Sequence, residues 1–179
     1  MTTQFQTAVT VDQFADNLAA VRARMAVAAE KVGRDPGEVR LLPVSKTVPE
    51  DRIRNAVAAG MTNLGENKVQ EAHRKWQNLA DLPVDWSIIG HLQTNKAKFV
   101  AEFATEFQAL SSIKMATALD RRLQQLGRSL DVFVQVNSSR EPQKFGLAPE
   151  EVGDFLAQMP QFGALKVKGL MTLAVFSKD

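Results

Sequence analysis

The first part of the chain follows a helical pattern of apolar and polar positions. From Val11 onward, apolar residues recur at alternating spacings of four and three, as on the buried stripe of an amphipathic helix. These residues are Phe14, Leu18, Val21, Met25, Ala28 and Val32. Thr10 and Gln13 have the spacing of a capping box. The pattern predicts an N-terminal helix over about residues 11–32, followed by Gly33.

Beyond Gly33 the pattern changes to short apolar runs, which are typical of buried strands. Six runs are candidates: Val39–Val44, Asn63–Leu64, Asp85–Ile89, Phe107–Leu110, Asp131–Val136 and Lys166–Met171. Helical stretches lie between them, at Pro49–Ala59, Asn95–Phe103, Lys114–Leu126 and Pro149–Met159. Because strands and helices alternate, the sequence predicts an α/β fold with parallel strands joined by crossover helices.

The residues after the predicted strands favour a barrel over an open dinucleotide-binding sheet. Val44 is followed by Ser45-Lys46-Thr47, without the glycine-rich turn of the open fold. Polar residues follow the strands instead, as they do at the functional end of a β/α barrel. They are Lys46, Glu66-Asn67, His91-Gln93, Ser111-Ser112 and Asn137-Ser138. We expect one domain over residues 1–179, a TIM-type barrel that is C-terminally incomplete, with six of its eight strands visible.

Composition narrows the classes of protein to consider. The 179 residues are 45% hydrophobic, which suits one globular domain with a core. The absence of cysteine excludes disulfides, thiolate metal sites and a cysteine nucleophile, and favours a cytoplasmic location. Met1–Gln6 lacks the features of a secretory signal, and no apolar run reaches the length of a membrane span. We therefore expect no membrane partner.

Charge and histidine spacing argue against nucleic acid as a partner and against a bound metal ion. The formal net charge is only +2 and the basic residues are scattered, so we expect no nucleic-acid partner. His73 and His91 do not form a ligand-spaced pair, so we expect no metal. A monomer is the preferred oligomeric state.

Lys46 is the strongest chemical candidate. It follows a strand expected to be buried on both faces, and a desolvated lysine is a usable nucleophile toward an aldehyde. The alternative is a solvated lysine at the end of a strand. Asn67 follows Gly65-Glu66, and its amide can donate and accept hydrogen bonds, although an ordinary turn explains this tripeptide equally well.

Three other polar residues are weaker candidates. His91 could carry a proton, donate a hydrogen bond or serve only as a loop residue. Asn137 leads into a polar loop in which Lys144 offers a second amine or an ordinary surface charge.

Several segments together resemble the pyridoxal-phosphate homeostasis protein family (YggS/PROSC type). They are Val44-Ser45-Lys46-Thr47, Leu64-Gly65-Glu66-Asn67-Lys68-Val69-Gln70-Glu71, Ile88-Ile89-Gly90-His91-Leu92-Gln93-Thr94-Asn95-Lys96, Val134-Gln135-Val136-Asn137 with Lys144-Phe145-Gly146, and Gly169-Leu170-Met171-Thr172. The ordered set, rather than any single motif, is specific, and it runs from about Leu41 to Met171.

The resemblance implies a barrel like the N-terminal domain of alanine racemase. It implies that pyridoxal 5'-phosphate (PLP) is bound as a Schiff base on Lys46, and that Asn67 lies beside the cofactor ring. His91, Asn137 and Met171, in other matched segments, are secondary candidates for cofactor contacts. It also implies a role in intracellular PLP homeostasis and transfer, with PLP-dependent apo-enzymes as recipients and no established catalytic reaction.

The sequence departs from the family in two segments. Family members continue into a Ser-Met-Gly-Met-Ser segment that cradles the phosphate, and into an Arg-Ile-Gly segment near the ring nitrogen. Neither segment occurs in these 179 residues, so we expect a weak or empty cofactor site.

Three alternatives to a PLP carrier remain open. The first is a PLP-dependent racemase or decarboxylase, in which His91 would have to be the opposing acid or base. The chain has no tyrosine to supply the second base that related racemases use. The others are a Schiff-base aldolase and an inactive barrel fragment.

Overall fold

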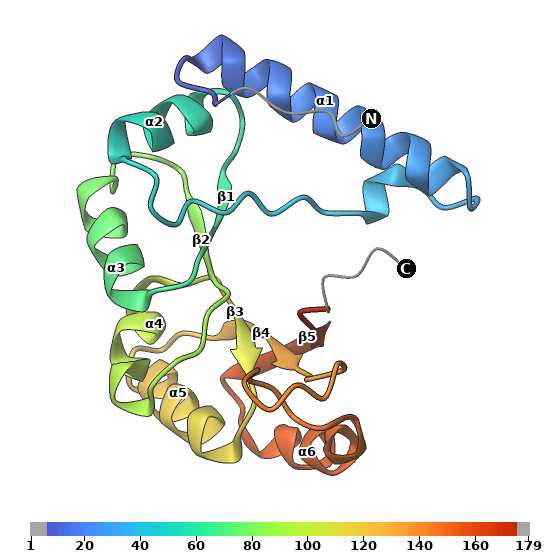
Figure 1. Cartoon of the computed structure of the whole chain (residues 1–179). Coiled ribbons are helices and arrows are strands. Elements are labelled where there is room, and N and C mark those ends of the chain that lie inside the picture. The colour runs from blue at the N-terminus through green and yellow to red at the C-terminus, as the bar shows by residue number, and fades with distance from the viewer. Residues whose placement is uncertain (1–6, 175–179) are drawn as a thin grey trace.

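Five parallel strands form the sheet of this protein, for which a computed structural model describes residues 7–174. They are β1 (Asn63–Glu66), β2 (Asp85–Ile88), β3 (Glu106–Leu110), β4 (Leu130–Gln135) and β5 (Leu165–Met171). Each strand pairs with the next strand along the chain, which is the strand order of a β/α barrel. Within residues 7–174 the ring of strands is open between β5 and the segment before β1 (Figure 1).

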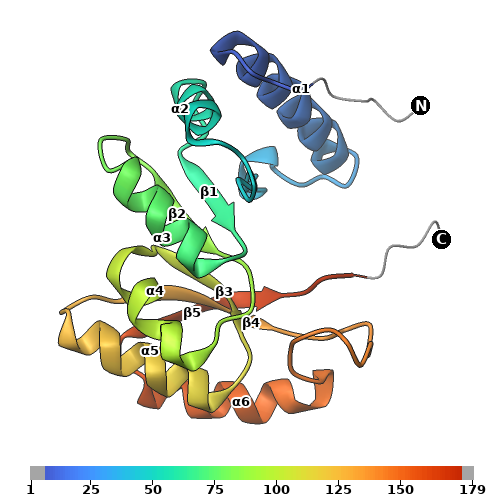
Figure 2. The same cartoon turned by 60° about the vertical axis from the view of Figure 1, so that its left-hand side comes forward.

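Helices connect the strands and cover one face of the sheet. They are α1 (Val11–Glu30), α2 (Glu50–Ala58), α3 (Val69–Asn78), α4 (Ala97–Phe103), α5 (Ile113–Gln125) and α6 (Val152–Gln158), with 3-10 turns η1 (Pro36–Glu38), η2 (Thr94–Lys96), η3 (Pro149–Glu151) and η4 (Met159–Gln161). Figures 1 and 2 show α2 to α5 following one another along the outer side of the strands. The predicted alternation of strand and helix is confirmed.

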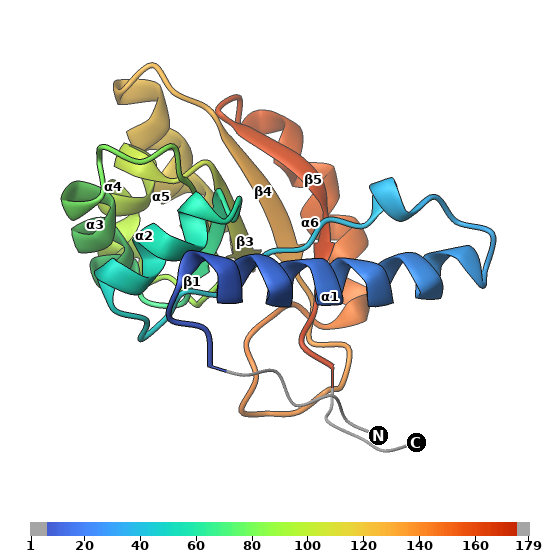
Figure 3. The ribbon, with the colours of Figure 1, turned by 90° about the horizontal axis from the view of Figure 1, so that it is seen from above.

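The N-terminal helix begins as predicted. The Thr10 side chain accepts from the backbone N–H of Gln13, and the Gln13 side chain accepts from that of Thr10. The helix ends at Glu30, two residues before the predicted end, and Val32 is 77% exposed. Seen from above in Figure 3, α1 runs across one side of the molecule, near α2. Asn55 of α2 donates to the Val9 carbonyl at 2.8 Å and ties α2 to the segment that leads into α1.

Five of the six predicted strands are present, within one or two residues. The prediction of a strand at Val39–Val44 is wrong, because this segment is extended but makes only one parallel bridge, between Val44 and Gly65. Pro43 within it has no N–H to donate to a ladder, and β1 is its single neighbour. The helix α3 was not among the predicted helices, although it carries residues that matter for the site.

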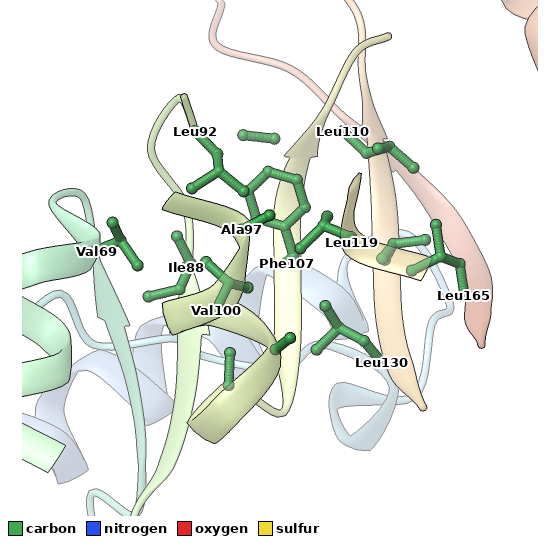
Figure 4. Close-up of a cluster of buried hydrophobic side chains, with 14 of the residues drawn as sticks. Val69, Ile88, Leu92, Ala97, Val100, Phe107, Leu110, Leu119, Leu130 and Leu165 are labelled. Carbon is green, nitrogen blue, oxygen red and sulfur yellow. The ribbon is translucent and has the colours of Figure 1, made fainter. Parts of the chain in front are cut away.

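The core lies between the sheet and the outer helices. Figure 4 shows Ile88 of β2, Phe107 of β3 and Leu130 of β4 in the same cluster as Val100 of α4 and Leu119 of α5. Each of these five side chains is at most 1% exposed. Because such interiors are close-packed, the strands have little freedom to slide. Their carboxyl ends are therefore held in fixed positions.

Candidate functional site

The five predicted cofactor contacts all lie at the carboxyl edge of the sheet. Lys46 follows Val44, which bridges Gly65 of β1, and Asn67 directly follows β1. His91 and Asn137 follow β2 and β4, and Met171 is the last residue of β5. Because parallel strands end on the same side, this edge gathers residues far apart in the sequence. The edge is therefore the candidate site.

Lys46 lies on an exposed turn with a free amine. Its side chain is exposed and Val44 before it is 46% exposed, so the expectation of a desolvated lysine after a strand buried on both faces is wrong. Within residues 7–174 Lys46 takes part in no hydrogen bond or ion pair. The two neighbouring residues are held firmly. The Ser45 N–H donates to the Gly65 carbonyl at 2.9 Å, and the Thr47 N–H donates to the Glu71 carboxylate at 3.0 Å.

Thr47 has an unusual backbone conformation. Its φ is +62°, in the left-handed region that β-branched residues rarely adopt. Glu71, on the first turn of α3, holds this turn through the Thr47 N–H. Lys46 is thus presented by a strained turn that a helix side chain stabilises.

Lys75 lies beneath this turn and is almost completely buried, at 1% exposure. Its ammonium donates to the Ser45 carbonyl at 2.8 Å, to Glu66 Oε1 at 2.7 Å and to Glu71 Oε1 at 2.9 Å. The Ser45 hydroxyl also donates to Glu66 Oε1, at 2.7 Å. A lysine ammonium has three protons to donate, and here each has an acceptor.

Glu66 and Glu71 differ in their surroundings. Glu66 is fully buried, and its Oε2 accepts no hydrogen bond from the described residues. The pKa of Glu71 lies below its ordinary value, chiefly because Lys75 donates a hydrogen bond to it and also because the Thr47 N–H does. Glu71 is therefore a carboxylate at neutral pH.

Asn67 is half-buried, and its backbone touches the loop after β2. A Cβ added at Gly90 would lie 2.1 Å from the Asn67 carbonyl oxygen and 2.8 Å from its carbonyl carbon. The Ile89 N–H donates to the Glu66 carbonyl at 2.9 Å, next to this contact. The backbones of Gly90 and Asn67 therefore lie so close that position 90 has no room for a side chain.

His91 stacks on Phe145. The ring centroids are 3.9 Å apart and the planes are within 8° of parallel. The stack joins the loop after β2 to the loop after β4. Within residues 7–174 neither ring nitrogen of His91 makes a hydrogen bond, so His91 has no group that orients it as an acid or base.

A recess of about 400 Å³ lies at the same edge, between the starts of α3 and α4. It is lined by Asn67, Lys68, Val69, Gln70, His91, Gln93 and Lys96. The volume falls within the range of small-molecule sites, roughly 300–1,000 Å³. The structure thus brings Asn67 and His91 together at one recess, while Lys46 does not line it.

Asn137 holds its own loop. Its side-chain amide donates to the Glu141 carbonyl at 2.8 Å, and its Oδ1 accepts from the Ser139 hydroxyl and the Glu141 N–H, both at 3.3 Å. The Lys144 amine donates to the Leu173 carbonyl at 3.2 Å and pairs with Glu141 at 2.6 Å. Lys144 is therefore engaged within the protein rather than free.

Met171 is half-buried at the end of β5 and packs against the core. Its carbonyl accepts from the Val136 N–H at 2.9 Å. It also borders an apolar cavity of about 310 Å³ that includes Val152 and Leu170. The polar candidates lie elsewhere on the edge, so Met171 offers an apolar contact.

Sequence reasoning missed Lys75. A signal was present, since Val69, Ala72, Lys75 and Leu79 are spaced as the buried stripe of a helix, with Glu71 four residues before the lysine. A lysine within such a stripe indicates a buried partner.

Residues 7–174 contain neither a metal-binding cluster nor a membrane-spanning helix. No group of three or more histidine, aspartate or glutamate side chains is arranged to hold a metal ion. In the same residues, no helix combines the length and the apolar character needed to cross a membrane.

The chain matches the family model of the alanine racemase N-terminal domain over residues 16–179. A pyridoxal phosphate homeostasis protein of Pseudomonas aeruginosa is 41% identical over 159 residues, which cover 89% of this chain and 69% of that protein. The protein of the same name from Escherichia coli K12 is 37% identical over 167 residues, covering 91% of this chain and 71% of its relative.

Solved structures agree with these matches. PipY of Synechococcus elongatus without PLP has a TM-score of 0.81 and 36% identity, covering 92% of this chain and 72% of PipY. PipY with PLP bound has a TM-score of 0.78 and 34% identity, with the same coverage. An alanine racemase of Clostridium difficile, at 13% identity and a TM-score of 0.64, covers 86% of this chain and 40% of that chain, and shows the shared barrel fold. The chain belongs to the pyridoxal phosphate homeostasis protein family.

Proposed function

We propose that this protein binds PLP covalently through Lys46 and takes part in intracellular PLP homeostasis and transfer. Its relatives are named for PLP homeostasis, and PipY, at 34% identity, has been solved with PLP bound. The observation that carries the proposal is the free, exposed amine of Lys46 on a turn held at both neighbouring residues.

The residues present fit a carbonyl cofactor. PLP would supply an aldehyde, and the Lys46 amine would hold it through a reversible covalent bond, with one water released. The exposed position of Lys46 would leave room for a second amine to take its place in an exchange. Lys46 would hold the cofactor until that exchange.

Asn67 is proposed to orient the cofactor ring. Its backbone lies close to Gly90, and its half-buried amide can donate and accept hydrogen bonds. His91 and Met171 are secondary contacts in this proposal. Asn137 would act indirectly, by holding the loop after β4 in place, since its side-chain amide already donates to the Glu141 carbonyl in that loop.

We propose a carrier rather than an enzyme. A racemase or decarboxylase needs a group that moves a proton at the substrate carbon, opposite the lysine. The sequence has no tyrosine, and His91 is stacked on Phe145 without a hydrogen-bonded orienting partner among the described residues. We expect PLP-dependent apo-enzymes to receive the cofactor, and the carrier to act as a monomer in the cytoplasm.

The proposal is tested by titrating the purified protein with PLP while the visible absorbance band is recorded. We expect a band that saturates in the native protein and is absent in Lys46→Ala. Lys98→Ala, on the surface of α4, is the matched control and should keep the band. Equal bands in Lys46→Ala and the native protein would contradict the proposal. Loss of substrate chirality with added PLP would instead support a racemase.

A further inference from the structure

We infer that Lys75 is a positioning residue for Lys46, because its buried ammonium ties together the two residues that flank Lys46. The inference rests on the proposed role of Lys46 and adds a residue to it. Lys75 lies on α3, outside the predicted site, and nothing in its position suggests contact with a ligand.

Both neighbours of Lys46 lead to the same nitrogen atom. The Ser45 carbonyl accepts directly from Lys75 Nζ at 2.8 Å. Thr47 is linked through one intermediate, since its N–H donates to Glu71 Oε1 and Lys75 donates to the same oxygen at 2.9 Å. The peptide units before and after Lys46 are thus fixed to one buried cation.

Simple packing does not account for a charged group in this position. Replacing a buried ion pair with apolar side chains is often neutral or stabilising, so stability alone does not require the ammonium. Here Lys75 is 1% exposed, yet two of its three bonds go to groups that hold the Lys46 turn. The third goes to Glu66, which in turn accepts from the Ser45 hydroxyl.

The turn needs such a restraint. Thr47 has a φ of +62°, which is unfavourable for threonine. The turn is closed by the Val48 N–H, which donates to the Ser45 carbonyl at 3.0 Å, and Lys75 and Glu71 restrain it further at Ser45 and Thr47. Loss of this further restraint would let the Lys46 amine move relative to Asn67, whose backbone lies close to Gly90. Fixing both residues in advance lowers the ordering cost of binding a ligand between them.

The test compares Lys75→Met with the native protein and with Lys98→Met, which removes an exposed lysine from α4. Hydrogen exchange of the Thr47 amide should accelerate at least about tenfold in Lys75→Met, because a charge-assisted hydrogen bond is lost or weakened. The dissociation constant for PLP should rise at least about tenfold. Neither value should change in Lys98→Met.

A second readout separates positioning from reactivity. The rate at which acetic anhydride acetylates Lys46, measured by peptide mass mapping, should change less than about threefold, since a small reagent needs no fixed orientation. If Lys75 instead sets the reactivity of the Lys46 amine, the acetylation rate would change together with the dissociation constant for PLP. This result would overturn the inference.

The amine at position 75 can be restored chemically through a single introduced cysteine, because the chain contains no other cysteine that would react. Lys75→Cys, alkylated with bromoethylamine while unfolded and then refolded, regains an amine of nearly the original length. We expect slow Thr47 exchange and PLP affinity to return with it. Failure of both to return in the refolded protein would count against the inference.

Glu71→Ala provides a second route if Lys75→Met does not fold. The Glu71 side chain is 22% exposed, and the substitution removes the acceptor of the Thr47 N–H without removing a buried charge. Thr47 exchange should accelerate in this variant as well. Unchanged exchange and PLP affinity in either folded variant would overturn the inference. If the native protein forms no adduct on Lys46, the proposed function fails, while Thr47 exchange still decides whether Lys75 restrains the turn.

Discussion

Gly90→Ala is expected to displace Asn67 from the site. The new Cβ would lie 2.1 Å from the Asn67 carbonyl oxygen, 2.8 Å from its carbonyl carbon and 2.9 Å from its Cα. Carbon–oxygen contacts are ordinarily no shorter than about 3.3 Å, so the two backbones must separate by about 1.2 Å. Gly90 does not have a positive φ, so the effect is purely steric.

The structure indicates the size of the effect. Overpacking costs about 1–3 kcal/mol, and loss of the neighbouring hydrogen bond from Ile89 to Glu66 adds about 1 kcal/mol. We therefore expect Gly90→Ala to lose about 2–4 kcal/mol of unfolding free energy. A displacement of this size at a binding group should weaken PLP binding on the order of 100-fold.

Urea unfolding followed by tryptophan fluorescence measures the change in stability. Trp86 is buried in β2 and Trp76 lies on α3, so both elements next to the site are monitored. Gly153→Ala on α6 is the control, since no described atom beyond its chain neighbours and the backbone of its own helix lies within 4 Å of its new Cβ. A Gly90→Ala protein with the native unfolding midpoint and native PLP affinity would refute the reasoning.

Three further substitutions test the loops and the turn. Gly146→Ala should make the loop 138–145 sensitive to limited proteolysis, because Gly146 has a φ of +125° and its new Cβ would lie 2.7 Å from the Asn137 nitrogen; an equally resistant loop would contradict this. Asn137→Ala should lower the unfolding free energy by about 1–2 kcal/mol, measured in urea, by removing the side-chain bonds that close the same loop. Glu71→Gln should flatten the acid dependence of stability. Because the folded pKa of Glu71 is lowered, its stabilisation is complete above the ordinary value of 4.5 and is lost as the pH falls through the folded pKa. An unchanged pH profile in Glu71→Gln would show that Glu71 does not contribute.

Local patterns predicted much of the fold. The capping box at Thr10 and Gln13 and five of the strands are where the sequence places them. These features depend on residues close together in the chain. The segment Val39–Val44 was predicted as a strand because it is apolar, but a ladder also needs N–H donors and neighbouring strands, and Pro43 lacks the donor.

The candidate site was predictable only in part. Residues that follow parallel strands must share an edge, so the placement of Lys46 and Asn67 at one edge followed from the strand assignment. The hydrogen bonds of Lys75 beneath Lys46 did not follow from the strand assignment. Lys75 contacts Ser45, which is 30 residues away in the sequence, and Glu66, which is nine residues away. A lysine in a helix is normally solvated, and the place of Lys75 in the apolar stripe of α3 indicates its burial but not which residues it contacts.

Borohydride reduction shows directly whether Lys46 forms the covalent bond to PLP. The protein is incubated with PLP, reduced, digested and mapped by mass spectrometry. We expect one stable pyridoxyl adduct, on the peptide that contains Lys46, and its absence in Lys46→Ala. An adduct mainly on Lys144 or another lysine, or none at saturating PLP, would show that Lys46 is not the lysine that binds PLP.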